Sequence, residues 1–400
     1  MLSNPIIKMP LSIPALGQEA YQEFNNILSY WINYSIDEEN GGFYGRVTAD
    51  NKPVPNEPKS IVINSRILWT FSTAYILFRK QAYLAVATRA FNYIETYFID
   101  KQNGGVYWSV NADGSPLERK KQIYGHAFAI FGLSEYYRAT KQAKALDLAI
   151  ELYKLVEKHS FDPQNGGYIE AFAPDWSQTD DYILSKGDHR KSMNTHLHLL
   201  EAYTNLYRAF PEVGLRQQLK KMLSSFTEHL IANNRMRLFF DEQWNVKSTE
   251  ISYGHDIEAS WLLWEAAEVL DDKVLLPKIK DISIGMAKAA ADGLAADSGL
   301  NYELNVATSR LNTNKDWWVQ AEAMVGFYNA YQLSGKVNYL EKATNSWEFI
   351  KKYLIDKEHG EWYWGVKEDH SVYNTDKINF WKCPYHNARA CLEIWRRAGE

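Results

Sequence analysis

Apolar residues recur along almost the whole chain at the i, i+3, i+4 and i+7 spacing of one helix face, in two alternating kinds of segment. The first kind is the more apolar. Its members are expected to be helices at 64–80, 122–139, 192–209, 254–270, 316–334 and 383–397. The second kind is expected at 17–34, 82–99, 143–159, 214–232, 273–291 and 338–354.

A glycine-rich segment separates one helix pair from the next and repeats along the chain. "DEENGGFYG" (37–45) returns as "DKQNGGVYW" (100–108) and "DPQNGGYIE" (162–170), with fainter copies at 297–303 and 356–365. "LFFDEQW" (238–244) occupies the remaining slot without the glycines. Glycine permits positive φ and alternating aromatic residues suit strands, so these segments predict short hairpins. The chain therefore holds about six copies of one unit.

Six helix pairs are enough to close a ring, so the repeat predicts an all-α fold, an (α/α)6 barrel with short β-hairpin loops. A linear solenoid is the alternative. We expect one catalytic domain over residues 1–400. The more apolar helices should form the inner ring, and if the topology repeats they run parallel, with their N-termini gathered at one mouth.

Composition and charge narrow the range of partners. The net charge is −5 with both signs interspersed, which argues against nucleic acid and anionic membranes. Two cysteines, Cys383 and Cys391, cannot build a disulfide framework and favour a reducing compartment. The N-terminus has prolines at 5, 10 and 14 and no secretion-signal pattern, and no stretch approaches the roughly 18 apolar residues of a membrane span. We expect a cytoplasmic monomer. The 14 Trp and 26 Tyr fit either a packed core or platforms for sugar rings.

Polar and aromatic residues occupy the first turns of all six expected inner helices. In chain order they are Arg66; Tyr124; Asn194 and His198; His255 and Glu258; Trp318 and Glu322; and Trp381, His386 and Arg389. Burying such groups without partners costs on the order of several kcal/mol. Their recurrence at one phase of a buried repeat therefore predicts a site at the mouth of the ring.

Two of these helices place a carboxylate one turn after a histidine. Glu258 is expected to bind the far N–H of His255 and fix its tautomer, and "HLHLLE" repeats the arrangement with His198 and Glu201. For any single histidine, a hydrogen-bonded core group is the ordinary alternative. Histidines facing a carbon next to a carbonyl could remove a proton from one side and return one to the other. This reaction is epimerisation through an enediolate, whose oxyanion Arg66 and the helix N-termini would stabilise.

Other chemistries find less support. Three histidines and a glutamate could bind zinc or iron, but neither His-x-x-x-His nor Glu-x-x-His occurs. The dinucleotide, ATP-binding and serine-nucleophile motifs are missing from the sequence, so no cofactor or metal is expected. Cys383 lies near His386 in sequence, and an inert thiol is favoured over a nucleophile.

Four segments carry a family resemblance: "KSMNTHLHLLEAYTNLYR" (191–208), "YGHDIEASWLLWEAAE" (253–268), "NKDWWVQAEAMVGF" (314–327) and "INFWKCPYHNARACLE" (378–393). They resemble the cellobiose 2-epimerase family, part of the wider N-acylglucosamine 2-epimerase group. The resemblance runs from residue 64 to the C-terminus. It implies an (α/α)6 barrel, chemistry without metal or nucleotide, and conversion of the reducing-end glucose of β-1,4-linked disaccharides to mannose.

The resemblance also implies roles for individual residues. His255 and His386 match the two acid/base histidines, and His198 matches a third that assists ring opening. Arg66 matches the arginine near the C1 and C2 oxygens, and Glu258 the partner of the catalytic histidine. The residues that match sugar contacts are Tyr124, Asn194, Trp318, Trp381 and, in a loop shorter than the family pattern, Asp188. His126 stands where glutamine is more familiar and is interpreted either as structural or as a residue behind those that contact the sugar.

Several alternatives stay open on sequence alone. N-acylglucosamine 2-epimerisation and aldose–ketose isomerisation use the same proton chemistry on the same scaffold. An inverting glycosidase would need two carboxylates about 6.5–9.5 Å apart, for which Glu258, Glu322 and Asp316 are the candidates. A sugar-binding scaffold without catalysis would leave His255 and His386 unexplained.

Overall fold

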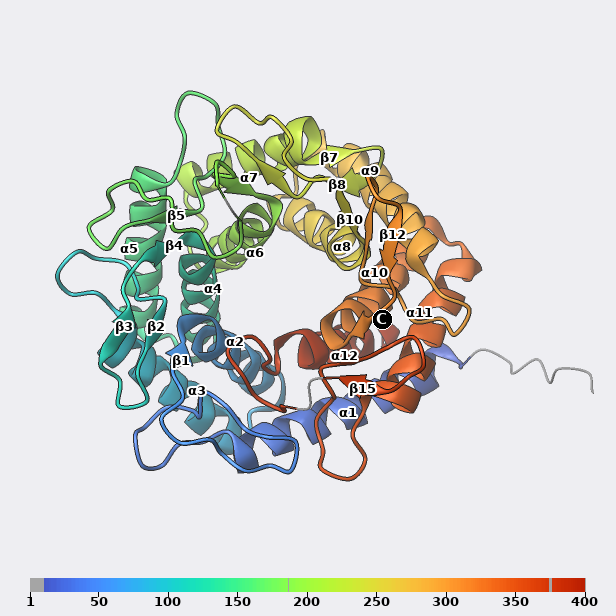
Figure 1. Ribbon diagram of the computed structural model, residues 1–400, viewed down its shortest axis with the longest axis horizontal. Helices are drawn as coiled ribbons and strands as arrows, with labels where there is room; N and C mark the ends of the chain where they lie inside the picture. Colours follow the sequence, from blue (N-terminus) through green and yellow to red (C-terminus); the bar gives the residue numbers. More distant parts are fainter. Residues whose placement is uncertain (1–10, 186, 374–375, 400) are drawn as a thin grey trace, which may run out of the picture.

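The computed structural model describes residues 11–185, 187–373 and 376–399, which form two concentric rings of helices (Figure 1). Each inner helix packs against the next, and α12 contacts α2, so the ring closes. The inner helices are α2 (Ile61–Phe78), α4 (Ile123–Thr140), α6 (Met193–Ala209), α8 (Tyr253–Leu270), α10 (Trp317–Ser334) and α12 (Tyr385–Ala398). The outer helices are α1 (Ile13–Tyr34), α3 (Gln81–Tyr93), α5 (Ala143–His159), α7 (Val213–Ser225), α9 (Leu275–Ala290) and α11 (Val337–Phe349).

The predicted (α/α)6 barrel is confirmed, and so are both classes of helix. Outer helices α3, α7 and α11 end in π-helical turns, at Ile94–Phe98, Phe226–Leu230 and Ile350–Leu354, and α9 ends in a 3₁₀ turn at Ala291–Gly293. The ring excludes the linear solenoid. Residues 1–10, on which the expectation about a secretion signal chiefly rests, lie outside the described residues.

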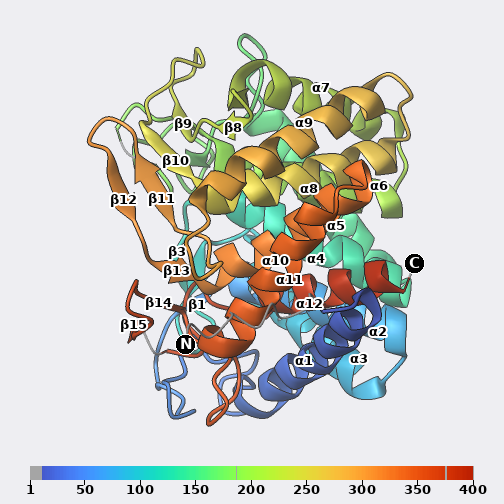
Figure 2. The same ribbon diagram turned by 90° about the vertical axis from the view of Figure 1, so that its right-hand side faces the viewer.

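Short antiparallel strands join the helices and gather at one end of the ring (Figure 2). Within the described residues they form three three-stranded sheets, ordered β1-β2-β3, β10-β11-β12 and β13-β14-β15, and the pairs β4-β5, β6-β9 and β7-β8. The strands are β1 (Lys59–Ser60), β2 (Ser109–Val110), β3 (Pro116–Glu118), β4 (Lys121–Gln122), β5 (Ala171–Phe172), β6 (Lys191–Ser192), β7 (Ile231–Ala232), β8 (Arg235–Met236), β9 (Phe239–Phe240), β10 (Glu250–Ser252), β11 (Glu303–Asn305), β12 (Arg310–Asn312), β13 (Lys315–Asp316), β14 (Gly365–Val366) and β15 (Val372–Tyr373). The glycine pairs at 41–42, 104–105 and 166–167 all have positive φ, as the hairpin prediction requires.

The inner helices are apolar nearly all round because they are covered on both sides. In α10, every residue from Val319 to Ala330 is buried. Close approach of neighbouring inner helices depends on glycine at one contact: a Cβ on Gly326 would meet the carbonyl oxygen of Ile257 in α8 at 2.7 Å.

One inner helix, α2, has the length and mean hydropathy of a membrane span. Helix α2 is long and apolar enough to cross a membrane by length and composition, with a mean hydropathy of 1.3 over its 18 residues. However, 72% of that helix is buried inside the protein, where it forms part of the inner ring. Its apolar character is accounted for by protein neighbours on both sides.

Buried ion pairs attach the glycine-rich turns to the inner helices. A lysine in the strand before the helix binds the aspartate that opens the turn. Three of these pairs are Lys59–Asp37 at 2.7 Å, Lys121–Asp100 at 2.6 Å and Lys191–Asp162 at 2.8 Å, and Lys315 lies 3.7 Å from Asp297 in a further repeat. The Lys121 and Asp100 side chains are completely buried. These pairs hold the loops of the mouth in register with the helices that carry the site.

A second repeated contact accounts for His126. Its Nε2 accepts the backbone N–H of Val106 at 3.1 Å, and its Nδ1 lies 2.8 Å from the carbonyl oxygen of Gln122. Gln320 makes the matching turn contact in another repeat, accepting the N–H of Leu300 at 2.7 Å. This geometry agrees with the structural role expected for His126.

Candidate active site

A cavity of about 200 Å³ lies at the mouth where the inner helices begin. It is lined by Arg66, Tyr124, Asn194, His198, His255, Glu258, Tyr302, Asp316, Trp317, Trp318, Trp364, Trp381 and His386. Nine of the ten site residues expected from the sequence are in this lining. They come together because each lies in, or just before, the first turns of an inner helix, and all six helices begin at the same end of the ring.

Asp188 is the predicted residue that the fold does not bring to this cavity. Its side chain is 67% exposed, and its carboxylate binds Lys247 at 2.8 Å. It lines a separate hollow together with Arg190 and Asp241. The loop that carries Asp188 lies at the surface. Asp188 is therefore outside the cavity, although it is only five residues before the start of α6.

The imidazole of His386 is held by a carboxylate from the neighbouring helix. Its Nδ1 lies 2.7 Å from Glu322 of α10. Glu322 also accepts the Trp261 indole N–H at 2.9 Å and the Arg389 guanidinium at 2.6 Å. Since an ionised carboxylate can only accept hydrogen bonds, Nδ1 carries the proton and Nε2 of neutral His386 keeps a free lone pair.

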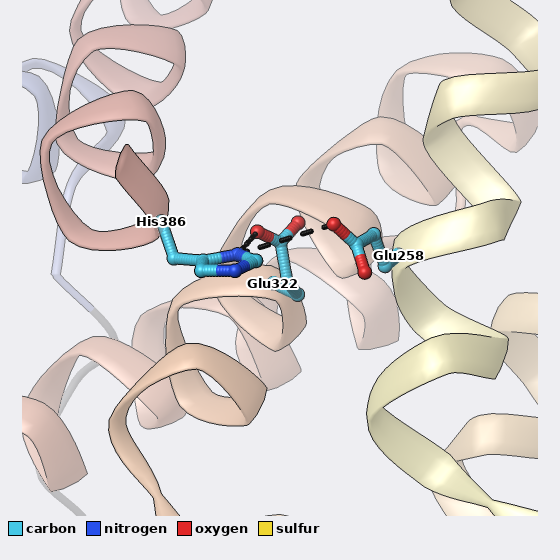
Figure 3. Close-up of side chains that lie close together, drawn as sticks. All are labelled: Glu258, Glu322 and His386. Carbon is cyan, nitrogen blue, oxygen red and sulfur yellow. Dashed lines mark hydrogen bonds and ion pairs between the residues drawn. The ribbon is translucent and has the colours of Figure 1, made fainter. Parts of the chain in front are cut away.

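Glu258 does not bind His255, so that part of the sequence prediction was wrong. Its carboxylate accepts from Arg389 at 3.0 Å and lies 3.9 Å from Nδ1 of His386 (Figure 3). Arg389 of α12 supplies a buried positive charge that no neighbour on α8 offers. Its attraction for the Glu258 carboxylate outweighs a contact between Glu258 and His255, one turn away on the same helix. Sequence spacing within one helix could not reveal it.

The two carboxylates at Arg389 ionise differently. Burial and the nearby negative charge of Glu322 raise the pKa of Glu258 well above its usual range. Burial also acts to raise the pKa of Glu322, but the Arg389 guanidinium and the His386 hydrogen bond outweigh it and lower that pKa to about 2. Glu322 is therefore ionised at neutral pH, and its charge together with burial favours the protonated form of Glu258.

Glu258, Glu322 and His386 are also close enough to hold a metal ion, with ligand atoms within 4.8 Å of one another. The Arg389 guanidinium already binds both carboxylates. A cation added there would have to displace or repel this buried arginine, so the donor set fits the guanidinium better than a metal.

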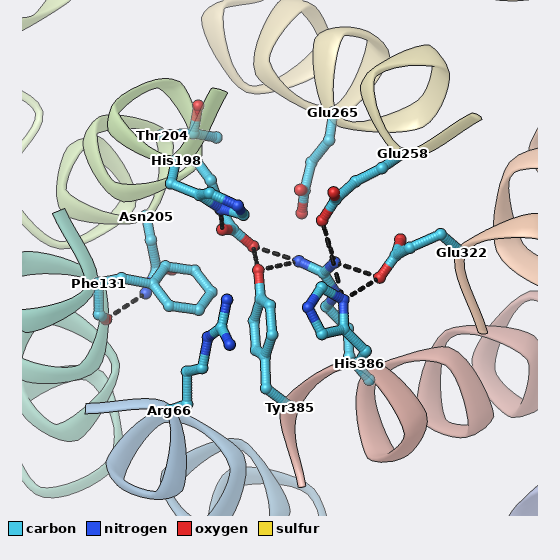
Figure 4. Close-up of polar contacts among 12 residues, drawn as sticks. Arg66, Phe131, His198, Thr204, Asn205, Glu258, Glu265, Glu322, Tyr385 and His386 are labelled. Atoms are coloured by element: carbon cyan, nitrogen blue, oxygen red, sulfur yellow. Dashed lines mark hydrogen bonds and ion pairs between the residues drawn. The ribbon is translucent and has the colours of Figure 1, made fainter. Parts of the chain in front are cut away.

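The predicted pairing of His198 with Glu201 is confirmed, with Nδ1 3.0 Å from the carboxylate. Glu201 also accepts hydrogen bonds from Arg389 and from the Tyr385 hydroxyl. The network runs from His198 through Glu201, Arg389 and Glu322 to His386. Figure 4 shows His198, Tyr385, Glu322 and His386 gathered around it. The two histidines are thus joined by one continuous chain of buried polar contacts.

His255 has a different kind of partner. Its Nδ1 lies 2.7 Å from the hydroxyl of Ser252, and its ring stands 4.8 Å from Trp318. The same indole lies 5.7 Å from the His386 ring, so both imidazoles flank one tryptophan. Burial lowers the pKa of His255 and of His386 to about 3, which leaves both rings neutral and able to accept a proton at pH 7.

Arg66 lies against the aromatic wall of the cavity. It donates to the Tyr124 hydroxyl at 2.9 Å, and its guanidinium stands over the Phe128 ring at 4.1 Å. The thiol of Cys383 lies 3.9 Å from Arg66. Burial nevertheless raises the pKa of this thiol, which fits an inert cysteine.

Four lining residues were not assigned to the substrate from the sequence: Tyr302, Asp316, Trp317 and Trp364. Asp316 accepts the Tyr373 hydroxyl, and burial raises its pKa to about 6. The Trp317 indole N–H is buried and, among the described residues, has no hydrogen-bond acceptor. For Asp316 and Trp317 the available signal was the "DWW" run (316–318) at the start of the fifth inner helix, because it occupies the same phase as the polar residues of the other repeats.

Comparisons with known proteins agree with this geometry. The family model described as N-acylglucosamine 2-epimerase matches residues 18–390. A cellobiose 2-epimerase from Bacteroides fragilis is 46% identical over 95% of this chain and 98% of its own length. Another, from Dictyoglomus turgidum, is 39% identical over 97% of this chain and 100% of its own. The crystal structure of a sugar epimerase from a ruminal bacterium superposes with a TM-score of 0.92 at 38% identity, covering 96% of this chain and 99% of that one.

Proposed function

The chain belongs to the N-acylglucosamine 2-epimerase family and is a carbohydrate epimerase, and on this premise we propose that it interconverts glucose and mannose at the reducing end of β-1,4-linked disaccharides. Cellobiose, lactose and mannobiose are the substrates we expect. The observation that carries the proposal is that His255 and His386 flank the same indole in one buried cavity. Two relatives that match most of the chain's length are named cellobiose 2-epimerase, which supports the choice of a disaccharide.

The reaction begins with opening of the reducing-end ring. His198 is suited to this step because Glu201 holds its Nδ1 and leaves Nε2 free to move the proton of the anomeric hydroxyl. Arg66 lies in the same cavity and donates to the oxygens on C1 and C2 as negative charge develops there. Trp318 and Trp381 hold the sugar rings by contact with their apolar faces.

Proton transfer at C2 follows. The two imidazoles face C2 of the open sugar from its two sides, one as the base and the other as the acid. Abstraction of the C2 proton by the Nε2 of His386 gives an enediolate and a His386 imidazolium, which Glu322 stabilises. As the negative enediolate forms, His255 takes up a proton from water on Nε2. It gives that proton to the other side of C2 and ends neutral, and His386 then releases the C2 proton to water. The reverse reaction exchanges the two roles.

Both imidazoles are protonated while the enediolate lies between them. With the cavity empty, burial holds the pKa of both at about 3, so the proton is not kept at pH 7. A negative enediolate between the two rings raises the pKa of each, so that the imidazolium is stabilised only when the intermediate is present. This dependence favours the transition state over the bound sugar.

The geometry of the Glu258–Glu322 pair disfavours its use in glycoside hydrolysis. Glu258 and Glu322 both bind the Arg389 guanidinium and have oxygens within 4.8 Å of each other, whereas an inverting pair needs roughly 6.5–9.5 Å and access to both sides of the bond. N-acylglucosamine 2-epimerisation and aldose–ketose isomerisation use the same proton transfer. The assay below separates them by substrate.

The test is to incubate the protein with cellobiose, lactose, mannose and N-acetylmannosamine and to identify the products by chromatography and NMR. We expect mannose-ended disaccharides from the first two and much slower turnover of the last two. The variants His255→Asn and His386→Asn should lose epimerisation. His159→Asn, in outer helix α5, should keep it. Absence of any mannose-ended product from either disaccharide would reject the proposed substrate class.

A further inference from the structure

The serine before α8, Ser252, makes a different hydrogen bond from the serines at the same position of other repeats. Ser60 and Ser192 cap α2 and α6, accepting the backbone N–H three residues later at 3.1 Å and 3.2 Å. Ser252 occupies the equivalent place before α8, yet its side chain makes no cap hydrogen bond. Its hydroxyl instead lies 2.7 Å from Nδ1 of His255, and the serine is 4% exposed.

The three histidines of the cavity therefore have partners of two chemical kinds at Nδ1. His198 and His386 face carboxylates, Glu201 and Glu322. His255 faces the neutral hydroxyl of Ser252. A carboxylate fixes the Nδ1 proton and also stabilises the imidazolium by its charge. A hydroxyl can accept the Nδ1 proton and orient the ring without adding negative charge.

We propose that Ser252 is a positioning residue for His255, accepting its Nδ1 proton so that Nε2 faces the sugar while the imidazolium stays easy to deprotonate. This inference rests on the proposed function. In both protonation states of His255, Nδ1–H donates to the Ser252 hydroxyl, and only the proton on Nε2 is transferred to or from C2. His386, supported by Glu322, is then the stronger base of the pair, and His255 the readier acid.

The proposal makes Ser252 distinct from a helix cap, and this gives a matched control. Ser252→Ala should lower kcat for cellobiose about tenfold with little change in KM, and Ser252→Thr, which keeps the hydroxyl, should restore most of the rate. Ser192→Ala removes a cap hydrogen bond in the neighbouring inner helix and should lower stability while keeping kcat within about threefold of the parent. Equal loss of kcat in Ser252→Ala and Ser192→Ala would overturn the proposal.

Deuterium exchange provides a readout that a structural role would not move. When C2 has been deprotonated by His386 in D₂O, weaker protonation by His255 returns more of the enediolate to the starting epimer. The measured quantity is the amount of C2 deuterium in recovered starting sugar divided by the amount in the epimerised product. For the epimer that His386 deprotonates, Ser252→Ala should therefore raise this ratio several-fold. An unchanged ratio from both epimers would contradict the assignment.

The tautomer can be measured without any turnover. In ¹⁵N-histidine-labelled full-length protein, with His255→Asn used to assign the signal, the ring nitrogens of neutral His255 should show the proton on Nδ1. Ser252→Ala should shift that tautomer balance toward Nε2–H, and Ser192→Ala should not. An Nε2–H tautomer in the parent protein, or no change in Ser252→Ala, would overturn the role of Ser252 even if the protein epimerises cellobiose. Failure of epimerisation with the expected tautomer would instead count against the proposed function.

Discussion

Replacing Glu322 by glutamine tests whether the charge beside His386 takes part in catalysis. Glu322 Oε1 accepts from both His386 and Arg389, while Oε2 accepts from Trp261. A glutamine keeps the first two bonds only by turning its oxygen toward them, which sets its amide N–H₂ against the Trp261 N–H. The other orientation would set the amide against the charged guanidinium, which costs more. The His386 imidazole therefore keeps its tautomer but no longer has a negatively charged carboxylate beside it.

The size of the effect follows from that loss. A hydrogen bond to a charged group contributes about 1.5–3 kcal/mol, and about 1.4 kcal/mol corresponds to tenfold in rate. We expect kcat for cellobiose to fall about 10- to 150-fold in Glu322→Gln, with a smaller change in KM, since the carboxylate acts through His386 in the transition state. Steady-state kinetics with product quantified by chromatography measures both constants.

A control separates catalysis from the general cost of removing a buried carboxylate. Glu135 is 3% exposed and binds Arg138 at 2.6 Å near the far end of α4. Glu135→Gln should destabilise the ring while keeping kcat within about threefold of the parent. If Glu322→Gln keeps kcat within twofold, or if Glu135→Gln lowers kcat equally, the reasoning about His386 is refuted.

Three further predictions concern stability and binding. His126 is fully buried and neutral: burial lowers its pKa to about 3 against 6.5 when unfolded, so the unfolded chain binds more protons between those values and stability falls as pH drops below 6.5. This site should cost about 2 kcal/mol at pH 5, and His126→Gln, which mimics Gln320, should remove that part of the loss in urea unfolding at pH 5 and 7.5; an identical loss in parent and variant would contradict it. Lys121→Met leaves Asp100 buried without its partner and should lower the free energy of unfolding by about 3–5 kcal/mol, whereas a change below 1 kcal/mol would refute the role of the pair. Trp318→Ala should raise KM for cellobiose about tenfold, about 1.4 kcal/mol of lost binding, and an unchanged KM would remove this ring from the sugar site.

The fold was predictable because its information is periodic. The spacing of apolar residues located all twelve α-helices in the described part of the chain, and the Gly-Gly pairs at 41–42, 104–105 and 166–167 located three of the turns between them. The inner ring also followed from sequence, since only helices covered on both sides need to be apolar all round. Closure of the ring then brought together residues such as Arg66 and His386 that lie more than 300 positions apart.

What the sequence could not supply was the choice of partner across helices. Spacing within α8 suggested Glu258 for His255, but the guanidinium of Arg389 from α12 holds that carboxylate instead. Spacing within α6 gave the correct partner for His198. Arg389 and Tyr385 bind the Oε1 oxygen of Glu201, which leaves Oε2 in contact with His198. Asp188 shows a different limit, since the course of an irregular loop is not encoded in a repeat.

The transfer of a proton between His255 and His386 is tested most directly with cellobiose deuterated at C2 of its reducing-end glucose. In ordinary water, the mannose-ended product should carry solvent hydrogen at C2, because the proton that arrives comes from a different imidazole than the one that took the deuteron. Product that keeps most of the original deuterium at C2 would contradict two-sided transfer and require a single group to move the hydrogen.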